Sequence, residues 1–172
     1  LEPSPTVKSD DPCIEHAARQ ATRGLDDASP EERARAMESF VKKYVSEKSL
    51  GVGFATASEV CATREGDCSE HAVLLAAMLR ADGIPSRAVS GLVYVDQFHQ
   101  SQKVFGFHMW AQALLEVNGV MCWVDLDAAV NPMDATHIAI SSSTLSDADV
   151  VNSMVSVAGM LTGLEIEVEE TE

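Results

Sequence analysis

Cys68, His108 and Asp127 are residues of the types that cooperate in acyl transfer. A cysteine thiolate is a strong nucleophile, an imidazole takes up and returns its proton, and a carboxylate orients the imidazole. Cys68 follows Gly66 and Asp67 and opens a predicted apolar helix. The positive end of a helix, with its free N–H groups, should lower the pKa of the thiol and hold an oxyanion. Gly66 should let a substrate approach the backbone closely.

The predicted sheet brings His108 and Asp127 together. Asn118-Gly119 is a strong hairpin signal between two β-rich segments, because both residues tolerate positive φ. Counting outward from this turn places Asp127 opposite Trp110, one same-face step from His108. Diagonal neighbours in an antiparallel pair lie ~7–8 Å apart at the backbone, within reach of a His–carboxylate hydrogen bond. Asp125 has the same parity but lies a step further away.

The elements that must position these residues are predicted to be helices in the N-terminal half of the chain and mainly β-strands in the C-terminal half. Capping signals and 3–4 residue apolar spacing, followed by alternating and β-branched segments, indicate this order. Helices are predicted at 12–23, 29–46, 57–62, 68–81 and 146–158, and strands at 87–95, 105–117, 120–126, 136–140 and 164–168. The order predicts an α+β fold with N-terminal helices packed on an antiparallel β-sheet. Residues 1–10 are predicted to form a linker and residues 11–170 a single domain.

The charge balance excludes some classes of partner. The 12 Lys+Arg against 27 Asp+Glu give a net charge of −15. Binding to nucleic acid or to an anionic membrane surface requires a basic surface, so neither is expected. The longest apolar run, Ala72 to Leu79, is far shorter than the ~20 residues of a transmembrane helix, so no membrane insertion is expected.

The chain ends and the cysteines give weaker indications of function than the charge does. The N-terminus has neither an initiator Met nor an apolar signal segment, so we expect an excised piece of a larger multidomain protein. The cellular compartment stays unknown, and an exported or cell-envelope location is only weakly favoured. The cysteines lack paired CxxC spacing. Cys13 and Cys122 are interpreted as buried or incidental, and a Cys61–Cys68 disulfide is kept as a minor alternative.

Four segments resemble motifs of the transglutaminase-like superfamily. The segment from Gly66 to Ala72, GDCSEHA, resembles its Cys motif, and Leu79 to Arg87 resembles its Arg-x-x-Gly-Ile-Pro-x-Arg segment. His108-Met109-Trp110 resembles its His-x-Trp motif, and Trp123 to Asp127 its closing Trp-x-x-x-Asp. The four occur in the family's order, within residues 56–129. Together they are specific, whereas any one alone is not.

The resemblance implies a papain-like, transglutaminase-like core and a catalytic triad carried by Cys68, His108 and Asp127. It implies a thioester formed from an amide of a protein or peptide substrate, then resolved by water or by an amine. No metal and no cofactor is implied. The chain departs from the family where Ala128-Ala129 follows Asp127 in place of Pro-Thr. It also has no Trp before Cys68 to serve as second oxyanion donor, so hydrolysis is favoured at least as much as crosslinking.

Other polar residues are assigned around this core. Gly66, Asp67, Trp110 and His71 are expected near the substrate or oxyanion. His71, one turn after Cys68, faces either the cleft or a local structural bond, and Trp110 forms core or a wall. His137 is interpreted as a strand-edge polar residue, with ligand use as the alternative. Arg80 and Arg87 are expected in structural ion pairs in preference to binding a substrate carboxylate.

Two other readings stay open. The first is a catalytically silent transglutaminase-like interaction module, in which Cys68 is a buried structural cysteine. The second is a thiolate–imidazole metal site built from Cys68, His71, His108 and Asp127.

Overall fold

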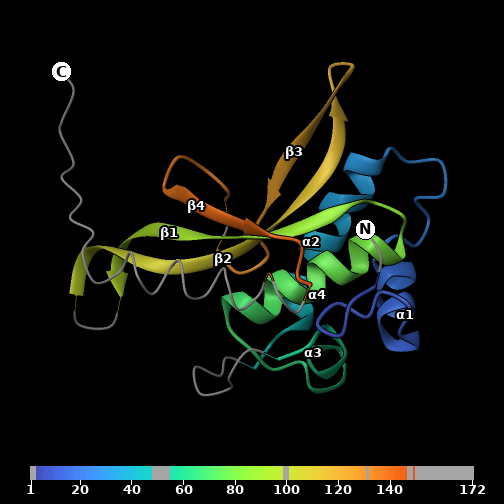
Figure 1. The fold of residues 1–172 in the computed structure, drawn as a ribbon, viewed down its shortest axis with the longest axis horizontal. Coiled ribbons are helices and arrows are strands. Elements are labelled where there is room, and N and C mark those ends of the chain that lie inside the picture. The colour runs from blue at the N-terminus through green and yellow to red at the C-terminus, as the bar shows by residue number, and fades with distance from the viewer. Residues whose placement is uncertain (1–2, 48–54, 99–100, 131, 147–148, 150–172) are drawn as a thin grey trace.

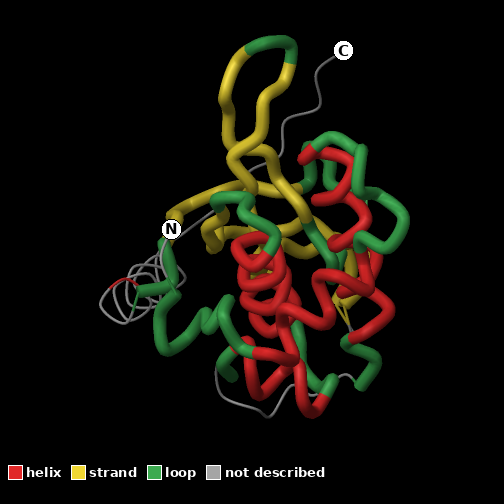
Figure 2. Tube along the Cα trace, turned by 90° about the vertical axis from the view of Figure 1, so that its right-hand side faces the viewer, coloured by secondary structure: helices red, strands yellow, loops and turns green. Residues whose placement is uncertain are grey.

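The computed structural model describes residues 3–47, 55–98, 101–130, 132–146 and 149. These residues form four helices and a four-stranded antiparallel sheet (Figure 1). The helices gather on one side of the sheet, and a long hairpin projects beyond the rest of the protein (Figure 2). The predicted α+β class is confirmed.

The four helices begin at capping signals that the sequence displays. They are α1 (Pro12–Ala21), α2 (Pro30–Tyr44), α3 (Ala57–Thr63) and α4 (Cys68–Ala81). Asp11 caps α1, while Ser29 and Thr56 form capping boxes with the Glu three residues later. The predicted starts are confirmed, and α1 ends two residues earlier than predicted. No helix among the described residues is long and apolar enough to cross a membrane.

The strands are β1 (Ser86–Phe98), β2 (Ser101–Val117), β3 (Val120–Leu126) and β4 (His137–Ser143), in the sheet order β3-β2-β1-β4. Asn118 and Gly119 form the predicted β2–β3 turn, with φ of 53° and 80°. The predicted register is confirmed, since Gln112 pairs with Asp125. The fourth strand pairs with β1, so the β3–β4 connection returns across the sheet.

The buried helix α4 packs against one face of the sheet. Eleven of its residues, from Glu70 to Arg80, are buried. The odd-numbered residues of β2 face the helices, and those in the core are Met109, Ala111, Ala113 and Leu115. Because side chains alternate along a strand, His108, Trp110 and Gln112 point to the opposite face. This alternation puts the polar residues of β2 together.

The structure describes most of the predicted N-terminal linker but little of the predicted C-terminal helix and strand. The linker predicted at 1–10 is wrong for the described part, because Val7 is fully buried and Ser4 Oγ donates to the Leu145 carbonyl over 2.6 Å. The Pro/Ser/Thr-rich composition of this segment correctly indicates irregular backbone. Irregular backbone can still pack on the domain, and here the side chain of Val7 fills a gap in the core. The helix predicted at 146–158 lies outside the described residues except at 146 and 149, and the strand at 164–168 lies wholly outside them.

The cysteine interpretation is also corrected. Cys13 of α1 and Cys61 of α3 form a disulfide, with Cα atoms 6.2 Å apart and 48 residues of separation. Cys13 is therefore not incidental, and a Cys61–Cys68 bridge is not formed, since Cys68 is a free thiol. The pairing depends on α1 lying beside α3, which no local spacing in the sequence reveals.

Gly91 makes the return of β4 possible, and this gives a first testable prediction. It pairs with His108 on β2 and Ala139 on β4. A Cβ at this position would lie 2.1 Å from the Ile138 carbonyl oxygen and 2.8 Å from Trp110 Cη2. Gly91→Ala should therefore displace β4 and lower the free energy of unfolding by at least about 2 kcal/mol in urea denaturation.

Gly106→Ala is the matched control for this prediction. Gly106 lies on neighbouring β2, and a Cβ added there meets nothing within 4 Å. That substitution should change the unfolding free energy by less than about 1 kcal/mol. Equal losses in the two variants would contradict the steric argument.

Candidate active site

Cys68 is the first residue of α4 and is half-buried. The preceding residue, Asp67, caps the helix, and its Oδ1 accepts the Ser69 N–H over 3.0 Å. The Met109 N–H donates to the Cys68 sulfur, so the thiol lies against the strand residue next to His108. The first turn of a helix leaves N–H groups without intrahelical acceptors, and these are the donors available at Cys68.

The electrostatics of Cys68 differ from the expectation of a lowered pKa. Burial, followed by the negative charge of Asp67, raises the pKa of the Cys68 thiol to about 11, against the opposing effect of the Met109 N–H. Glu70 and Asp127 add further negative charge. Desolvation and acidic neighbours outweigh the helix terminus here. The Cys68 side chain is therefore a thiol at neutral pH, and a thiolate would form there only if a base removed its proton.

His108 and Asp127 are in direct contact. His108 Nε2 lies 2.5 Å from Asp127 Oδ2, and the two residues are 3% and 0% exposed. The other carboxylate oxygen, Oδ1, accepts the N–H groups of Ala129 and Val130 over 2.8 and 3.0 Å. The backbone turn that follows Asp127 thus holds its carboxylate through the N–H groups of Ala129 and Val130.

Asp127 remains ionised in this buried position. Burial acts to raise its pKa, but the hydrogen bond and charge of His108 and the N–H groups of Val130 and Ala129 hold the pKa of Asp127 below its usual value. A carboxylate only accepts hydrogen bonds, so His108 Nε2 must carry the hydrogen. In neutral His108 the lone pair is then on Nδ1, which is the nitrogen left to accept a proton.

Glu38 is a buried acid that the sequence analysis missed. It belongs to α2, is 6% exposed, and its Oε1 accepts the Asp127 N–H over 2.7 Å. Burial raises the pKa of Glu38, opposed chiefly by the charge of Arg35. The signal was present, because Glu38 lies four residues after Ala34 and three before Val41, inside the apolar stripe. A carboxylate in such a stripe indicates a buried hydrogen-bonding role.

His137 begins β4, which is an edge strand as expected, but its side chain is buried at the site. Its side chain is 0% exposed, and its Nε2 lies 3.0 Å from Asp127 Oδ2. The ligand atoms of His108, Asp127 and His137 lie within 4.8 Å of one another, a set of the kind that transition metals bind. Among the described residues this set includes neither Cys68 nor His71, so it differs from the thiolate–imidazole metal site that was kept as an alternative.

Trp110 is both core and wall. It is 1% exposed, and its ring stacks on the His108 ring at 5.9 Å between centroids. Its Nε1–H donates to Asp125 Oδ1 over 2.7 Å, and the same oxygen accepts from Gln112 Nε2. Asp125, expected further from His108 than Asp127, is thus used to fix the tryptophan that flanks the imidazole.

The residues expected near the oxyanion have mainly local contacts. A Cβ at Gly66 would lie 2.2 Å from the Glu70 Cβ, so the glycine makes room for Glu70. Its expected role in substrate approach stays a prediction. Asp67 is the helix cap described above. His71 is 1% exposed, and its Nδ1 lies 2.5 Å from the Asp67 carbonyl oxygen, the local bond given as its alternative.

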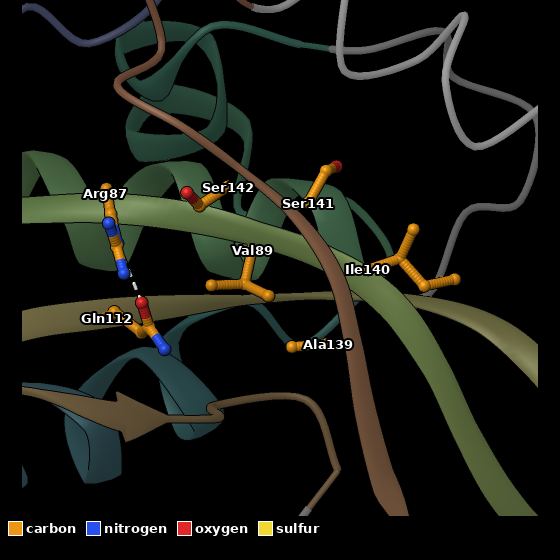
Figure 3. A pocket seen from close by; sticks show the side chains of 7 residues that line it. All are labelled: Arg87, Val89, Gln112, Ala139, Ile140, Ser141 and Ser142. Carbon is orange, nitrogen blue, oxygen red and sulfur yellow. Dashed lines mark hydrogen bonds between the residues drawn. The ribbon is translucent and has the colours of Figure 1, made fainter.

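The two arginines near the Gly-Ile-Pro turn both donate hydrogen bonds to neutral oxygens. Arg80 donates to the carbonyls of Ser86 and Thr144. Arg87 donates to Gln112 Oε1 over 2.7 Å and lies over the Trp123 ring. Arg87 and Gln112 point toward each other at one wall of a cavity of about 220 Å³ (Figure 3). Gln112 is four residues along β2 from His108, about 13 Å, so this wall of the cavity is distant from the contact between His108 and Asp127.

Solved structures with a similar fold include two from bacteria. A candidate cysteine protease from Cytophaga hutchinsonii is 22% identical with a TM-score of 0.66, and the match covers 86% of this chain and 46% of that one. A candidate protease from Parabacteroides distasonis is 18% identical with a TM-score of 0.44, covering 67% and 23%. The likeness to the protein from C. hutchinsonii shows the fold alone, and this chain spans less than half the length of that protein.

Comparison by sequence gives the family. None of the proteins with curated descriptions matches the sequence. The model of the transglutaminase-like superfamily matches residues 15–128, well over half of the chain. The match begins within α1 and ends just after Asp127. Of the groups that contact the Asp127 side chain, it leaves out His137 and the N–H groups of Ala129 and Val130. The chain belongs to the transglutaminase-like superfamily.

Proposed function

We propose that this protein is a cysteine-dependent acyl-transfer enzyme acting on amide bonds of protein or peptide substrates. Cys68 is the nucleophile, His108 the base and Asp127 the group that orients His108. The observation that carries the proposal is the buried 2.5 Å contact between His108 Nε2 and Asp127 Oδ2. An ionised carboxylate on Nε2 leaves Nδ1 of His108 as proton acceptor, which is the state a general base needs.

The acylation step starts from the protonated thiol. Because the pKa of Cys68 is raised to about 11, proton transfer from sulfur to His108 Nδ1 accompanies attack of sulfur on the amide carbonyl carbon. The carbonyl oxygen becomes an oxyanion, which N–H groups at the start of α4 stabilise. The C–N bond then breaks, His108 returns the proton to the leaving amine nitrogen, and the acyl group remains on sulfur as a thioester.

The deacylation step repeats these transfers. Water or a second amine attacks the thioester carbon while His108 takes a proton from it. The C–S bond breaks, and the proton passes from His108 to the sulfur of Cys68. Water gives a carboxylic acid, and an amine gives a new amide. We propose hydrolysis as the principal outcome, since no tryptophan precedes Cys68 to serve as the second oxyanion donor of the crosslinking enzymes.

A silent interaction module is the second candidate, and the raised pKa of Cys68 favours it. Burial and three acidic neighbours oppose the thiolate, as they would in a domain that has no use for a nucleophile. The two candidates differ in a single property, namely whether His108 can activate the thiol.

Acylation by p-nitrophenyl acetate tests the proposal directly. We expect release of p-nitrophenol in a burst of one equivalent, with the acetyl group found on Cys68 by peptide mass spectrometry. Cys122, the other free thiol, is the internal control and should react at least about tenfold more slowly. Faster loss of the acetyl group with added cadaverine would identify amine transfer. Equal labelling of the two cysteines would favour the silent module.

A further inference from the structure

His137 is a buried polar residue that the proposed acyl transfer does not use. An orienting carboxylate needs one histidine, yet Asp127 Oδ2 receives two, with His108 Nε2 at 2.5 Å and His137 Nε2 at 3.0 Å. The histidines belong to β2 and β4, which β1 separates in the sheet. The β1 residue paired with His108 is Gly91, so no side chain stands beside His108 at that position. Two imidazole nitrogens and a carboxylate oxygen thus converge from three segments of the chain.

These three ligand atoms suit a transition-metal ion. They lie within 4.8 Å of one another. Zinc binds imidazole nitrogen at about 2.0–2.1 Å and carboxylate oxygen at about 2.0–2.2 Å, which places neighbouring tetrahedral ligands about 3.3 Å apart. Reaching that spacing opens the two contacts to Asp127, now 2.5 and 3.0 Å, by less than about 1 Å. Two nitrogens and one oxygen favour zinc over Mg²⁺ and Ca²⁺, which prefer oxygen ligands alone.

The groups behind these ligands orient them toward one another. Asp127 Oδ1 accepts the N–H groups of Ala129 and Val130 over 2.8 and 3.0 Å, which leaves Oδ2 to face the histidines. The second ring nitrogen of His137, Nδ1, lies 3.8 Å from Asp134 Oδ1. Metal-binding histidines donate their second ring N–H to an acceptor of this kind, and the pairing fixes the ring and strengthens the metal bond.

Trp110 contacts both histidine rings. Its ring stacks on that of His108 with centroids 5.9 Å apart, and the His137 ring lies edge-on to it at 83° with centroids 5.5 Å apart. The His137 side chain is 0% exposed. Neither ring can turn without moving the tryptophan. Ligands that are ordered before binding lose little conformational entropy when a metal arrives, which favours this site over the exposed carboxylates of an acidic surface.

We propose that His108, Asp127 and His137 form a Zn²⁺-binding site, through the two Nε2 atoms and Oδ2, and that zinc bound there reversibly inhibits acylation of Cys68. The ligands come from β2, from the end of the β2–β3 hairpin and from β4, so the site exists only in the folded sheet. Among the described residues Cys68 lies outside the ligand set.

The inhibition, unlike the binding, rests on the proposed function, in which His108 Nδ1 takes the thiol proton. A neutral imidazole carries a single ring hydrogen. When zinc takes the lone pair of Nε2, that hydrogen is on Nδ1, and His108 has no lone pair left for the thiol proton. The same ion binds Asp127 Oδ2, so the carboxylate no longer orients His108. Chelation of the zinc returns both groups to the acyl-transfer arrangement.

Equilibrium dialysis of the metal-free full chain against zinc sulfate tests the site, with zinc measured by elemental analysis. Excess Mg²⁺ in the buffer occupies exposed carboxylates, so the zinc that remains reports a nitrogen-containing site. We expect one zinc per chain. His137→Gln should weaken binding at least about 100-fold, and Asp134→Asn, which changes an outer-shell partner, about tenfold. His16→Gln, at an exposed position on α1, should bind zinc as the wild type does.

Cobalt identifies the ligands without a substitution, so the test stands even if a variant fails to fold. Co²⁺ held by nitrogen and oxygen absorbs in the visible range, whereas a cysteine ligand adds a strong thiolate-to-cobalt band in the near ultraviolet. We expect the visible bands without the thiolate band, and the same spectrum from Cys68→Ala.

Three results would overturn the zinc site. These are binding well below one zinc per chain, equal zinc affinity in the wild type and in a folded His137→Gln, and a thiolate band in the cobalt form. Zinc should also abolish the p-nitrophenyl acetate burst at the concentration that fills the site, and EDTA should restore the burst. A full burst from the zinc-loaded protein would overturn the inhibition. Failure of the proposed function shows separately, as absence of the acetyl group on Cys68 in the metal-free protein.

Discussion

Replacing His108 with alanine is expected to slow acylation of Cys68 by p-nitrophenyl acetate about 10³- to 10⁴-fold at pH 7. A thiol whose pKa is about 11 is deprotonated in only about one molecule in 10⁴ at that pH. Without His108 the reaction depends on this small thiolate population. The variant should therefore recover about tenfold in rate for each pH unit as the pH rises toward about 11. Stopped-flow burst kinetics across this range measure both the loss and the slope.

The controls for this prediction are Cys68→Ala and Cys122→Ala. The first removes the nucleophile and should abolish the burst at every pH, whereas the second should leave it unchanged, because Cys122 lies on β3, away from Asp127. The double variant Cys68→Ala/His108→Ala should lose no more than Cys68→Ala alone, because the two groups act as a unit. If His108→Ala keeps the wild-type rate at pH 7, His108 is not the base.

The hairpin shows how much of the site the sequence determines. Asn118-Gly119 accommodates positive φ at both positions, and this turn sets the pairing of β2 with β3. Side chains alternate along these strands, so the approach of His108 to Asp127 follows from counting. The same local rules predict where α4 begins, because Asp67 and Glu70 cap the helix at Cys68.

The position of His137 in the site depends on pairing between strands that are distant in the sequence. No turn signal connects β4 to its partner, and the strand pairs with β1 through a bulge between Ser90 and Gly91. His137 therefore reaches Asp127 by a route that residue counting does not reveal. Gly91 was the available clue, since a glycine inside a β-rich segment often marks a bulge or a close backbone approach.

The pKa of Cys68 was mispredicted for a different reason. Position at a helix N-terminus predicts a lowered pKa for Cys68, and the helix does begin there. The opposing contributions are burial, which depends on tertiary packing, and three acids, of which Asp67 and Glu70 are sequence neighbours and Asp127 is brought close by the fold. The local sequence predicts the helix dipole at Cys68, whereas the burial of the Cys68 thiol follows only from the fold.

Removing the disulfide with Cys13→Ala/Cys61→Ala is expected to lower the free energy of unfolding by about 4 kcal/mol. The bond closes a loop of 48 residues, and chain-entropy estimates for a loop of this length give that value. For a chain of this size the melting temperature should fall by about 8–16 °C, measured by circular dichroism. The disulfide joins α1 to α3, and neither helix supplies a residue to the Asp127 cluster. Acetylation of Cys68 well below the melting temperature should therefore be unchanged.

Two measurements separate the disulfide from simple loss of buried sulfur. Cys61 is 2% exposed, so alanine leaves a small void, but the wild type treated with reductant has no void and should still melt close to the double variant. A thiol titration of the denatured, unreduced wild type should count two thiols, those of Cys68 and Cys122, and four after reduction. Four thiols before reduction, or a melting temperature that reductant leaves unchanged, would show that α1 and α3 are held by packing alone. The stability of the domain would then rest on the α4 core, into which Ile14 of α1 and Val60 of α3 pack.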